Sequence, residues 1–296
     1  MSHMGIFKFA NGTIRVKDLE KSIEFYRDVI GMHELAREKG VVYFGCGADE
    51  TFDIAIKEGG TGVEQFALQV ADEEDIQYYE KKLTNLGIST QRMSNPEPGK
   101  KVALRFAAPS GHQLELALME DRPHYLHPVA GHKGSRGIGI LDADHITLHT
   151  KDVKGLAEFL QEALDFRVAD VFEPAPGVWG AAWTHASDYH HDVALIGTSE
   201  DTTLHHFAFL VSGFEDMKRA CDLLAQAGYK IETGPGRHGV GGNLFTYFLD
   251  PSGNRIELSA EMPRADRSVP HKVWPDFPPA FSTWGALPPE SFAKGS

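Results

Sequence analysis

The chain has 296 residues, 42% of them hydrophobic and 24% charged, which is long enough for two globular domains. Its formal net charge of −13 argues against nucleic acid as a partner, and no apolar run is long enough to cross a bilayer. The only cysteines are Cys46 and Cys221 and no signal-peptide pattern is visible, so we expect a cytoplasmic protein without disulfides.

The first half of the chain contains two predicted units, each with a strand, an amphipathic helix and further strands. In the first unit, residues 16–32 (VKDLEKSIEFYRDVIGM) place apolar residues at helical spacing directly after the end of a strand. In the second unit, residues 73–86 form the predicted helix. Short runs bounded by turn residues indicate the strands, which we predict at 41–46, 52–57, 66–70, 102–106 and 113–118.

The second half repeats this order after a stretch at 121–140 that is rich in Pro, Gly and His and shows no clear period. Residues 150–166 (TKDVKGLAEFLQEALDF) match the helical stretch of the first unit, and DPSGNRIELS matches the earlier APSGHQLELA. A further helix is predicted at 214–227. The predicted strands are 144–149, 178–185, 191–197, 205–211, 244–249 and 255–261.

These repeats predict an α+β fold of four βαβββ modules that form two barrel-like domains. We expect an N-terminal domain at 5–120 with two degenerate modules, a linker at 121–140, and a catalytic domain at 141–262. The tail at 263–296 combines prolines with aromatic residues, so we expect it to pack on the body without regular structure. Curled sheets of this kind enclose a cavity that suits a small ligand.

Three glycines, Gly234, Gly236 and Gly239, match the G-x-G-x-x-G pattern of dinucleotide-binding loops. That pattern needs a helix after the glycines, but the following residues indicate a strand, a D-P-S-G turn and a second strand. We therefore predict a flexible loop followed by a β-hairpin, and no nucleotide site.

Three side chains that can bind a metal are predicted to face the cavity of the second domain. In DHITLH, Ile146 and Leu148 suit the helix side, which leaves His145 on the cavity side. The same alternation places His206 there, with His205 on the opposite face, and Glu257 follows on the last strand. Two imidazoles and a carboxylate form the facial triad of non-haem Fe(II) sites, although buried histidines are often simply core residues.

The segment HHFAFLV, the later RHG, a tyrosine and DPSGNRIEL resemble the C-terminal signature of the type I extradiol ring-cleaving dioxygenases. These enzymes, which include catechol 2,3-dioxygenases, belong to the vicinal oxygen chelate superfamily. The resemblance is strongest over residues 141–262. It departs at Thr246, where the family usually has a large apolar residue before the tyrosine.

The resemblance implies metal ligands at His145, His206 and Glu257, holding Fe(II) or, as the alternative, Mn(II). It also implies that His191 stabilises negative charge developing on oxygen and then donates a proton, and that His238 and Tyr247 hydrogen-bond the substrate. The implied reaction is meta cleavage of catechol or a substituted catechol by O2, to a 2-hydroxymuconic semialdehyde type of product. The family also implies a homotetramer or larger assembly.

The matching positions of the first half carry Asn11, Gln65 and Glu115. Amide oxygens are poor ligands for ferrous iron, so we expect this half to serve as a scaffold without a metal.

Two other classes of protein remain open, a metal-dependent isomerase or lyase of the same superfamily and a non-enzymatic binder of small molecules. Glyoxalase-type relatives use four protein ligands, but the stretch at 193–196 offers no carboxylate, which favours the dioxygenase. Trp183, His149 and aromatic tail residues are expected to line the pocket and to favour alkyl- or aryl-substituted rings. The sequence does not place Arg237 or Arg255, the cations that an acidic substrate would need.

Overall fold

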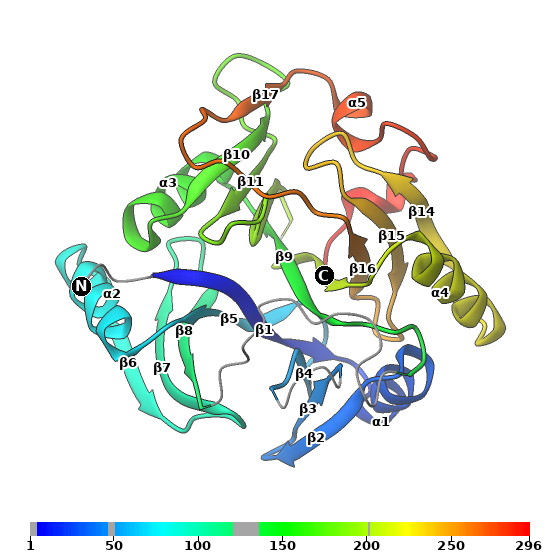
Figure 1. The fold of residues 1–296 in the computed structure, drawn as a ribbon, viewed down its shortest axis with the longest axis horizontal. Coiled ribbons are helices and arrows are strands. Elements are labelled where there is room, and N and C mark those ends of the chain that lie inside the picture. Colours follow the sequence, from blue (N-terminus) through cyan, green and yellow to red (C-terminus); the bar gives the residue numbers. More distant parts are fainter. Residues whose placement is uncertain (1–4, 47–50, 121–135, 201) are drawn as a thin grey trace.

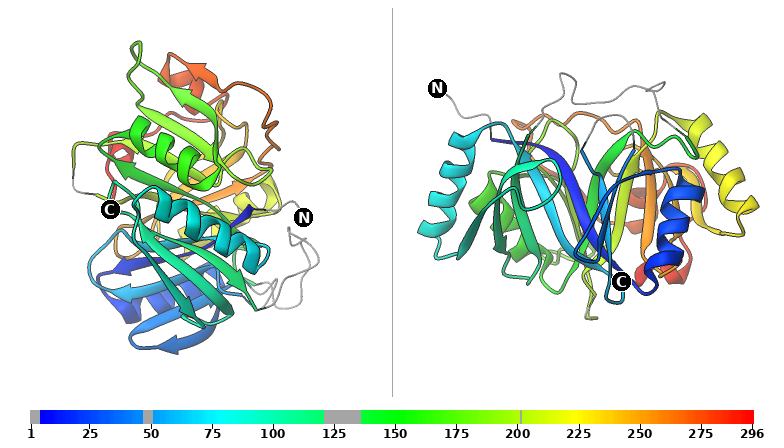
Figure 2. Two further views of the ribbon diagram at one scale, coloured as in Figure 1. Left: turned by 90° about the vertical axis from the view of Figure 1, so that its left-hand side faces the viewer. Right: turned by 90° about the horizontal axis from the view of Figure 1, so that it is seen from below.

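The computed structural model describes residues 5–46, 51–120, 136–200 and 202–296. Two strongly curled mixed sheets lie side by side, with helices α1 to α4 on their outer surfaces (Figure 1). The two views in Figure 2 show the same sheets from the side and from below. The predicted α+β fold of repeated βαβββ modules is confirmed.

The first sheet has eight strands in the order β2-β3-β4-β1-β5-β8-β7-β6. Each of its two modules contributes one helical segment between its first and second strands. In chain order the elements are β1 (Ile6–Val16), α1 (Leu19–Glu24) continuing into the wider turns of η1 (Phe25–Ile30), β2 (His33–Glu38), β3 (Val41–Gly45), β4 (Ile54–Glu58), β5 (Val63–Val70), α2 (Glu73–Asn85), β6 (Thr90–Ser94), β7 (Lys100–Ala107) and β8 (Gln113–Met119).

The second sheet repeats this plan, with β9 and β13 at its centre in place of β1 and β5, and adds β17 at one edge. The tail supplies β17, a short helix α5 and a final turn η2. In chain order the elements are β9 (Asp142–Thr150), α3 (Val153–Leu164), β10 (Arg167–Phe172), β11 (Ala181–His185), β12 (Val193–Gly197), β13 (Leu204–Leu210), α4 (Phe214–Gln226), β14 (Ile231–Arg237), β15 (Leu244–Leu249), β16 (Arg255–Ala260), β17 (Lys272–Trp274), α5 (Phe277–Phe281) and η2 (Glu290–Ala293).

Local chemistry accounts for the helix positions in both halves. Asp18, Asp72 and Asp152 each precede a helix and accept a hydrogen bond from a backbone N–H of its first turn. Each helix then buries one apolar stripe against the outer face of its sheet. The inner faces of the sheets are thereby left free to enclose a cavity.

Apart from β17 in the tail, the strands that the sequence pattern does not predict are β2, β6, β10 and β14, and each is the first of three in a module. Three of them form edges of the sheets, and β10 is separated from an edge only by β17. Their residues are largely exposed or half-buried, as in β2 and β6. A strand that does not bury one full face lacks the apolar alternation that reveals strands in a sequence.

The glycine-rich stretch is not the flexible loop predicted from the sequence. Gly234 and Gly236 lie within β14, which pairs with β15. A Cβ on Gly236 would come within 3.0 Å of the Trp284 carbonyl oxygen, and one on Gly239 within 1.8 Å of the Pro279 carbonyl oxygen. These two glycines therefore allow the tail to approach the strand closely. The hairpin of β15 and β16 has the predicted antiparallel pairing.

The tail contains regular structure, contrary to the prediction. Strand β17 adds to β10 in parallel, and α5 has prolines in its first turn, where the missing N–H costs nothing. Farther on, Phe292 packs between the rings of His205 and Tyr247. The prolines of the tail therefore do not prevent a short strand and a short helix from forming there.

The predicted linker at 121–140 lies mostly outside the described residues, and the division into domains remains a prediction. Within the part of the chain that the structure covers, no helix combines the length and apolarity needed to span a membrane.

Candidate metal centre and its cavity

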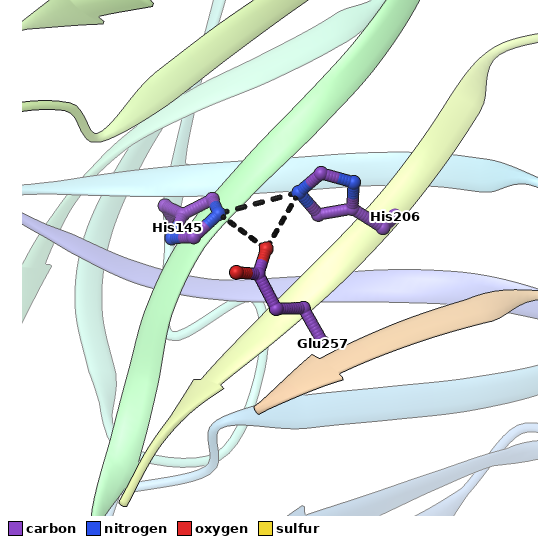
Figure 3. Close-up of side chains that lie close together, drawn as sticks. All are labelled: His145, His206 and Glu257. Carbon is purple, nitrogen blue, oxygen red and sulfur yellow. Dashed lines mark hydrogen bonds and ion pairs between the residues drawn. The ribbon is translucent and has the colours of Figure 1, made fainter. Parts of the chain in front are cut away.

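His145, His206 and Glu257 meet at one point inside the second sheet (Figure 3). The two Nε2 atoms are 3.3 Å apart, and Glu257 Oε2 lies 3.1 Å from Nε2 of His145 and 2.9 Å from Nε2 of His206. All three side chains are at most 5% exposed. The structure thus brings together the three residues that the sequence analysis proposes as ligands.

Strand register explains the meeting of these three side chains. Ala208 on β13 pairs with His145 on β9 and with Glu257 on β16, so both functional side chains flank one small residue. His206 lies two residues earlier on the same strand, which puts it on the same face. The central strands of the sheet therefore hold the ligands on rigid backbone.

His205 faces the cavity as well, and the prediction of one histidine on each face of this strand is wrong. The pairing of β13 with β9 shifts register between Leu204 and His206. Such a bulge interrupts the alternation of side chains. His205 and His206 consequently lie on the same side, with their Nδ1 atoms 2.6 Å apart.

The donor set fits a divalent metal such as Fe(II) or Mn(II). Three ligand atoms on adjacent corners of an octahedron, at bonds of about 2.1 Å, stand roughly 3 Å from one another. The distances of 2.9, 3.1 and 3.3 Å match this requirement. The second ring nitrogens are also held, because His145 Nδ1 contacts Asp144 at 2.7 Å and His206 Nδ1 contacts His205. A His-His-Glu site of this type is typical of Fe(II) and Mn(II) extradiol dioxygenases.

The charges of the three groups are strongly coupled. Burial alone lowers the pKa of His145, but Glu257 and Asp144 outweigh it and raise the pKa to about 9. Burial lowers the pKa of His206 to about 4. Burial of Glu257 disfavours its charge, yet the surrounding histidines hold its pKa well below the usual range. In the metal-free site, His145 therefore holds the proton that a metal must displace.

Metal affinity is accordingly expected to rise with pH. Below about pH 9 a proton on His145 competes with the ion, so one displaced proton gives roughly a tenfold gain in affinity per pH unit. The measurement is titration of the metal-free protein with Mn(II) at several pH values between about 6 and 9. A flat profile would show that His145 is already deprotonated.

The structure places His191, His238 and Tyr247 around the same point. The His191 ring centroid is 4.2 Å from that of His145. His238 Nδ1 donates to the Phe281 carbonyl at 2.6 Å, which leaves Nε2 to accept from the Tyr247 hydroxyl at 2.9 Å. Burial and then Glu257 raise the pKa of Tyr247 well above its usual value, and burial lowers that of His191. A neutral phenol and a neutral imidazole thus flank the metal position.

All six of these side chains line one cavity of about 350 Å³. Its remaining polar side chains are Thr147, His205 and Asn243. Ile196, which lies in the stretch that offers no carboxylate as a fourth ligand, also lines the cavity. The other walls are apolar and come from strands and tail: Phe172, Gly180, Ala181, Trp183, Gly197, Val240, Phe277, Ala280, Phe281 and Phe292.

Trp183 and three aromatic tail residues, Phe277, Phe281 and Phe292, line the cavity as predicted, but His149 does not. A Cβ on Gly295 would lie 2.2 Å from His149 Nδ1, so the tail packs directly on this ring. His149 instead borders a separate surface cavity and contacts the Thr202 hydroxyl at 2.7 Å.

Neither candidate cation for an acidic substrate reaches the cavity. Arg237 binds the Gly242 carbonyl and Glu261. Arg255 forms a two-pronged ion pair with Glu232 and donates to the carbonyls of tail residues 291 and 294. Arg255 therefore anchors the tail beside the metal centre.

In the first half, the carboxylate that corresponds to Glu257 is neutralised by protein cations. Lys100 Nζ lies 2.7 Å from Glu115 and also pairs with Glu97, and Arg105 pairs with Glu115 from the other side. Burial disfavours the charge of Glu115, but Lys100 and Arg105 lower its pKa overall. A buried ammonium thus supplies the positive charge that a metal would supply in the second half.

Replacing Lys100 by methionine is therefore expected to lower the free energy of unfolding by about 3–5 kcal/mol, because it leaves a buried carboxylate undercompensated. Urea unfolding measures the loss, with Lys101→Met at the exposed neighbouring position as control. Equal stability of the two variants would contradict the assigned role of Lys100.

Sequence reasoning missed several residues around the centre. Asn243 lines the cavity, with its Nδ2 3.2 Å from Ser259. His190 contacts His191 and His205 contacts His206, each through paired Nδ1 atoms, and Asp170 in turn contacts His190. The paired histidines at 190–191 and 205–206 were the visible signal, but a sequence does not show which member of a pair supports the other.

Comparison with known proteins places this site in a family. The chain matches the model of the Glyoxalase/Bleomycin resistance protein/Dioxygenase superfamily over residues 5–116 and 142–258. It is 29% identical over 263 residues to a metapyrocatechase of Pseudomonas sp. (strain CF600), covering 86% of both chains. It is 27% identical over 266 residues to a manganese-dependent 2,3-dihydroxybiphenyl 1,2-dioxygenase of Geobacillus genomosp. 3, covering 86% of this chain and 84% of the relative.

The fold agrees with these relatives. The structure of homoprotocatechuate 2,3-dioxygenase from Brevibacterium fuscum, in complex with 3,4-dihydroxyphenylacetate, matches with a TM-score of 0.85 and 26% identity, over 98% of this chain and 92% of that one. The 2,3-dioxygenase LapB from Pseudomonas sp. KL28 matches with a TM-score of 0.83 and 27% identity, over 92% and 98%. The chain therefore belongs to the Glyoxalase/Bleomycin resistance protein/Dioxygenase superfamily and, within it, to the extradiol ring-cleaving dioxygenases.

Proposed function

We propose that this chain cleaves catechol, or a catechol with an alkyl or aryl substituent, by extradiol insertion of both atoms of O2. The observation that carries this proposal is the buried facial arrangement of His145, His206 and Glu257 in an apolar cavity. Fe(II) is the proposed metal, with Mn(II) as the alternative. The expected product is of the 2-hydroxymuconic semialdehyde type.

His145, His206 and Glu257 would hold the metal and leave one side of it open to the cavity. When bound, the ion would act as a Lewis acid and a redox centre that brings a catecholate and O2 together. Because only three protein side chains would hold the ion, its remaining coordination positions would be available to the substrate and O2. The apolar walls exclude water from this reaction.

Tyr247 and His238 are proposed to take the proton of a substrate hydroxyl. The Tyr247 oxygen can accept that proton while its own hydrogen passes to His238 Nε2, the atom to which it is already hydrogen-bonded. The resulting imidazolium keeps its Nδ1–H on the Phe281 carbonyl. His191, whose ring lies beside that of His145, is proposed to take up the proton of the other substrate hydroxyl. As the resulting imidazolium it would stabilise negative charge on oxygen and then return the proton.

An uncharged ring substituent is favoured by the composition of the cavity. No lysine or arginine is among the side chains that line it in the described part of the chain. A carboxylate buried there without a cation would cost several kcal/mol, and each 1.4 kcal/mol corresponds to a factor of about ten in affinity. We therefore expect kcat/KM for a neutral substituted catechol to exceed that for 3,4-dihydroxyphenylacetate at least about tenfold.

The test is oxygen uptake after anaerobic loading with Fe(II), and separately with Mn(II), using catechol, alkyl and aryl catechols and 3,4-dihydroxyphenylacetate. Uptake with a yellow ring-fission product supports extradiol cleavage, and the panel ranks the substrates. Bound metal without uptake would point to another chemistry of the superfamily. Absence of both would refute the ligand assignment. Light scattering in the same preparation tests the proposed homotetramer or larger assembly.

A further inference from the structure

A line of hydrogen bonds leads from His191 away from the metal position. His191 Nδ1 lies 3.0 Å from His190 Nδ1, and His190 Nε2 lies 2.5 Å from Asp170 Oδ2. The other carboxylate oxygen of Asp170 accepts from the indole N–H of Trp274 at 3.1 Å. All three members of the line from Asp170 to His191 are buried, at 4–8% exposure.

These contacts fix where the protons lie when both imidazoles are neutral. The Asp170 carboxylate can only accept, so His190 must carry its hydrogen on Nε2 and has a bare Nδ1. That bare nitrogen accepts the Nδ1–H of His191. His191 therefore presents a bare Nε2, able to take a proton, as the nitrogen not engaged by His190.

The line ends away from the substrate cavity. Asp170 and His190 line a second cavity of about 420 Å³, together with tail residues 265–272, whereas His191 lines the metal cavity. Asp170 lies on β10, next to the tail strand β17 that carries Trp274. The tail thus contributes to the hydrogen bonding of a residue at the reaction site.

We propose that Asp170 and His190 are positioning residues that hold His191 as its Nδ1–H tautomer, with the bare Nε2 available to the reaction. This inference rests on the proposed catalytic role of His191 and adds two residues behind it. This arrangement resembles other active sites in which a carboxylate holds a histidine in the tautomer that the reaction needs.

The substitution Asp170→Asn tests the assignment because it reverses every hydrogen bond in the line. The oxygen of the introduced amide would keep the Trp274 N–H, so the amide NH2 group would face His190 and donate to Nε2. His190 would then carry its hydrogen on Nδ1 and donate to His191, which must move its own hydrogen to Nε2. The change replaces oxygen by nitrogen at nearly constant volume.

The readout is ¹⁵N NMR of metal-free protein labelled at histidine, recorded at about pH 9, where ordinary imidazoles are neutral. We expect the Nδ1–H tautomer of His191 in the natural chain and the Nε2–H tautomer in Asp170→Asn. The matched control is Trp274→Phe, which removes a donor to Asp170 but leaves the carboxylate an acceptor, so the tautomer should stay. The same tautomer in the natural chain and in Asp170→Asn would overturn the inference.

Kinetics then shows whether the tautomer matters for turnover. In the Fe(II)-loaded enzyme, Asp170→Asn is expected to keep its metal content and KM and to lose about 10- to 100-fold in kcat, as when outer partners of active-site histidines are removed. A changed tautomer with unchanged kcat would overturn the positioning role. Failure of the proposed function would appear separately, as lack of oxygen uptake by the natural chain.

Discussion

Replacing Glu257 by alanine is expected to reduce bound iron from about one ion per chain to background. Glu257 is the only anionic member of the ligand set, and it lies within 3.1 Å of the ligand nitrogens of both histidines. Without it, two neutral imidazoles in a buried site would face a divalent cation with no charge compensation. Oxygen uptake should vanish together with the metal.

The measurement is metal analysis after anaerobic loading and gel filtration. The matched control is Glu115→Gln, at the corresponding carboxylate of the first half, where Lys100 and Arg105 already supply the cations. That variant should retain about one ion per chain. Full metal content in the Glu257→Ala protein would refute the ligand assignment. A second ion per chain in the natural protein that is lost in a folded Glu115→Gln variant would instead reveal a site in the first half.

His191→Asn is expected to keep the metal and lose most of the turnover. His191 is not one of the three clustered ligands, but its ring packs against His145 and lines the cavity. Asparagine retains polarity but cannot take up and return a proton, and general acid–base groups typically contribute about 10²- to 10⁴-fold. We expect kcat to fall within that range at unchanged metal content.

Steady-state oxygen uptake and metal analysis on the same preparation check this result. His149→Asn is the control, because His149 is equally buried and lies on the same strand as His145 but is outside the cavity. Full activity of metal-loaded His191→Asn would show that His191 takes no part in the reaction. Loss of metal would instead make it a structural support of the centre.

Much of the fold and the three clustered residues followed from sequence pattern. Central strands such as β9 and β16 are buried on both faces, with one apolar face and one polar face that lines the cavity. Their apolar residues therefore alternate and reveal which side chains share a face. Internal repetition then supplied the four modules. The edge strands β2 and β6 were not predicted. Both of their faces are partly exposed to solvent and carry polar residues, so they lack the apolar alternation of a buried strand.

The sequence by itself determined the module repeat and the three ligands. Each was recognised from the pattern of apolar and polar residues within one short stretch, and such local patterns do not depend on tertiary contacts. Family resemblance added His191, His238 and Tyr247, and tertiary structure alone decided what surrounds these six residues. A register shift on β13 turned both His205 and His206 toward the cavity, the tail covered His149, and Arg255 became an anchor for the tail. Each of these outcomes depends on contacts between segments distant in sequence, whose geometry is set by packing and not by local periodicity.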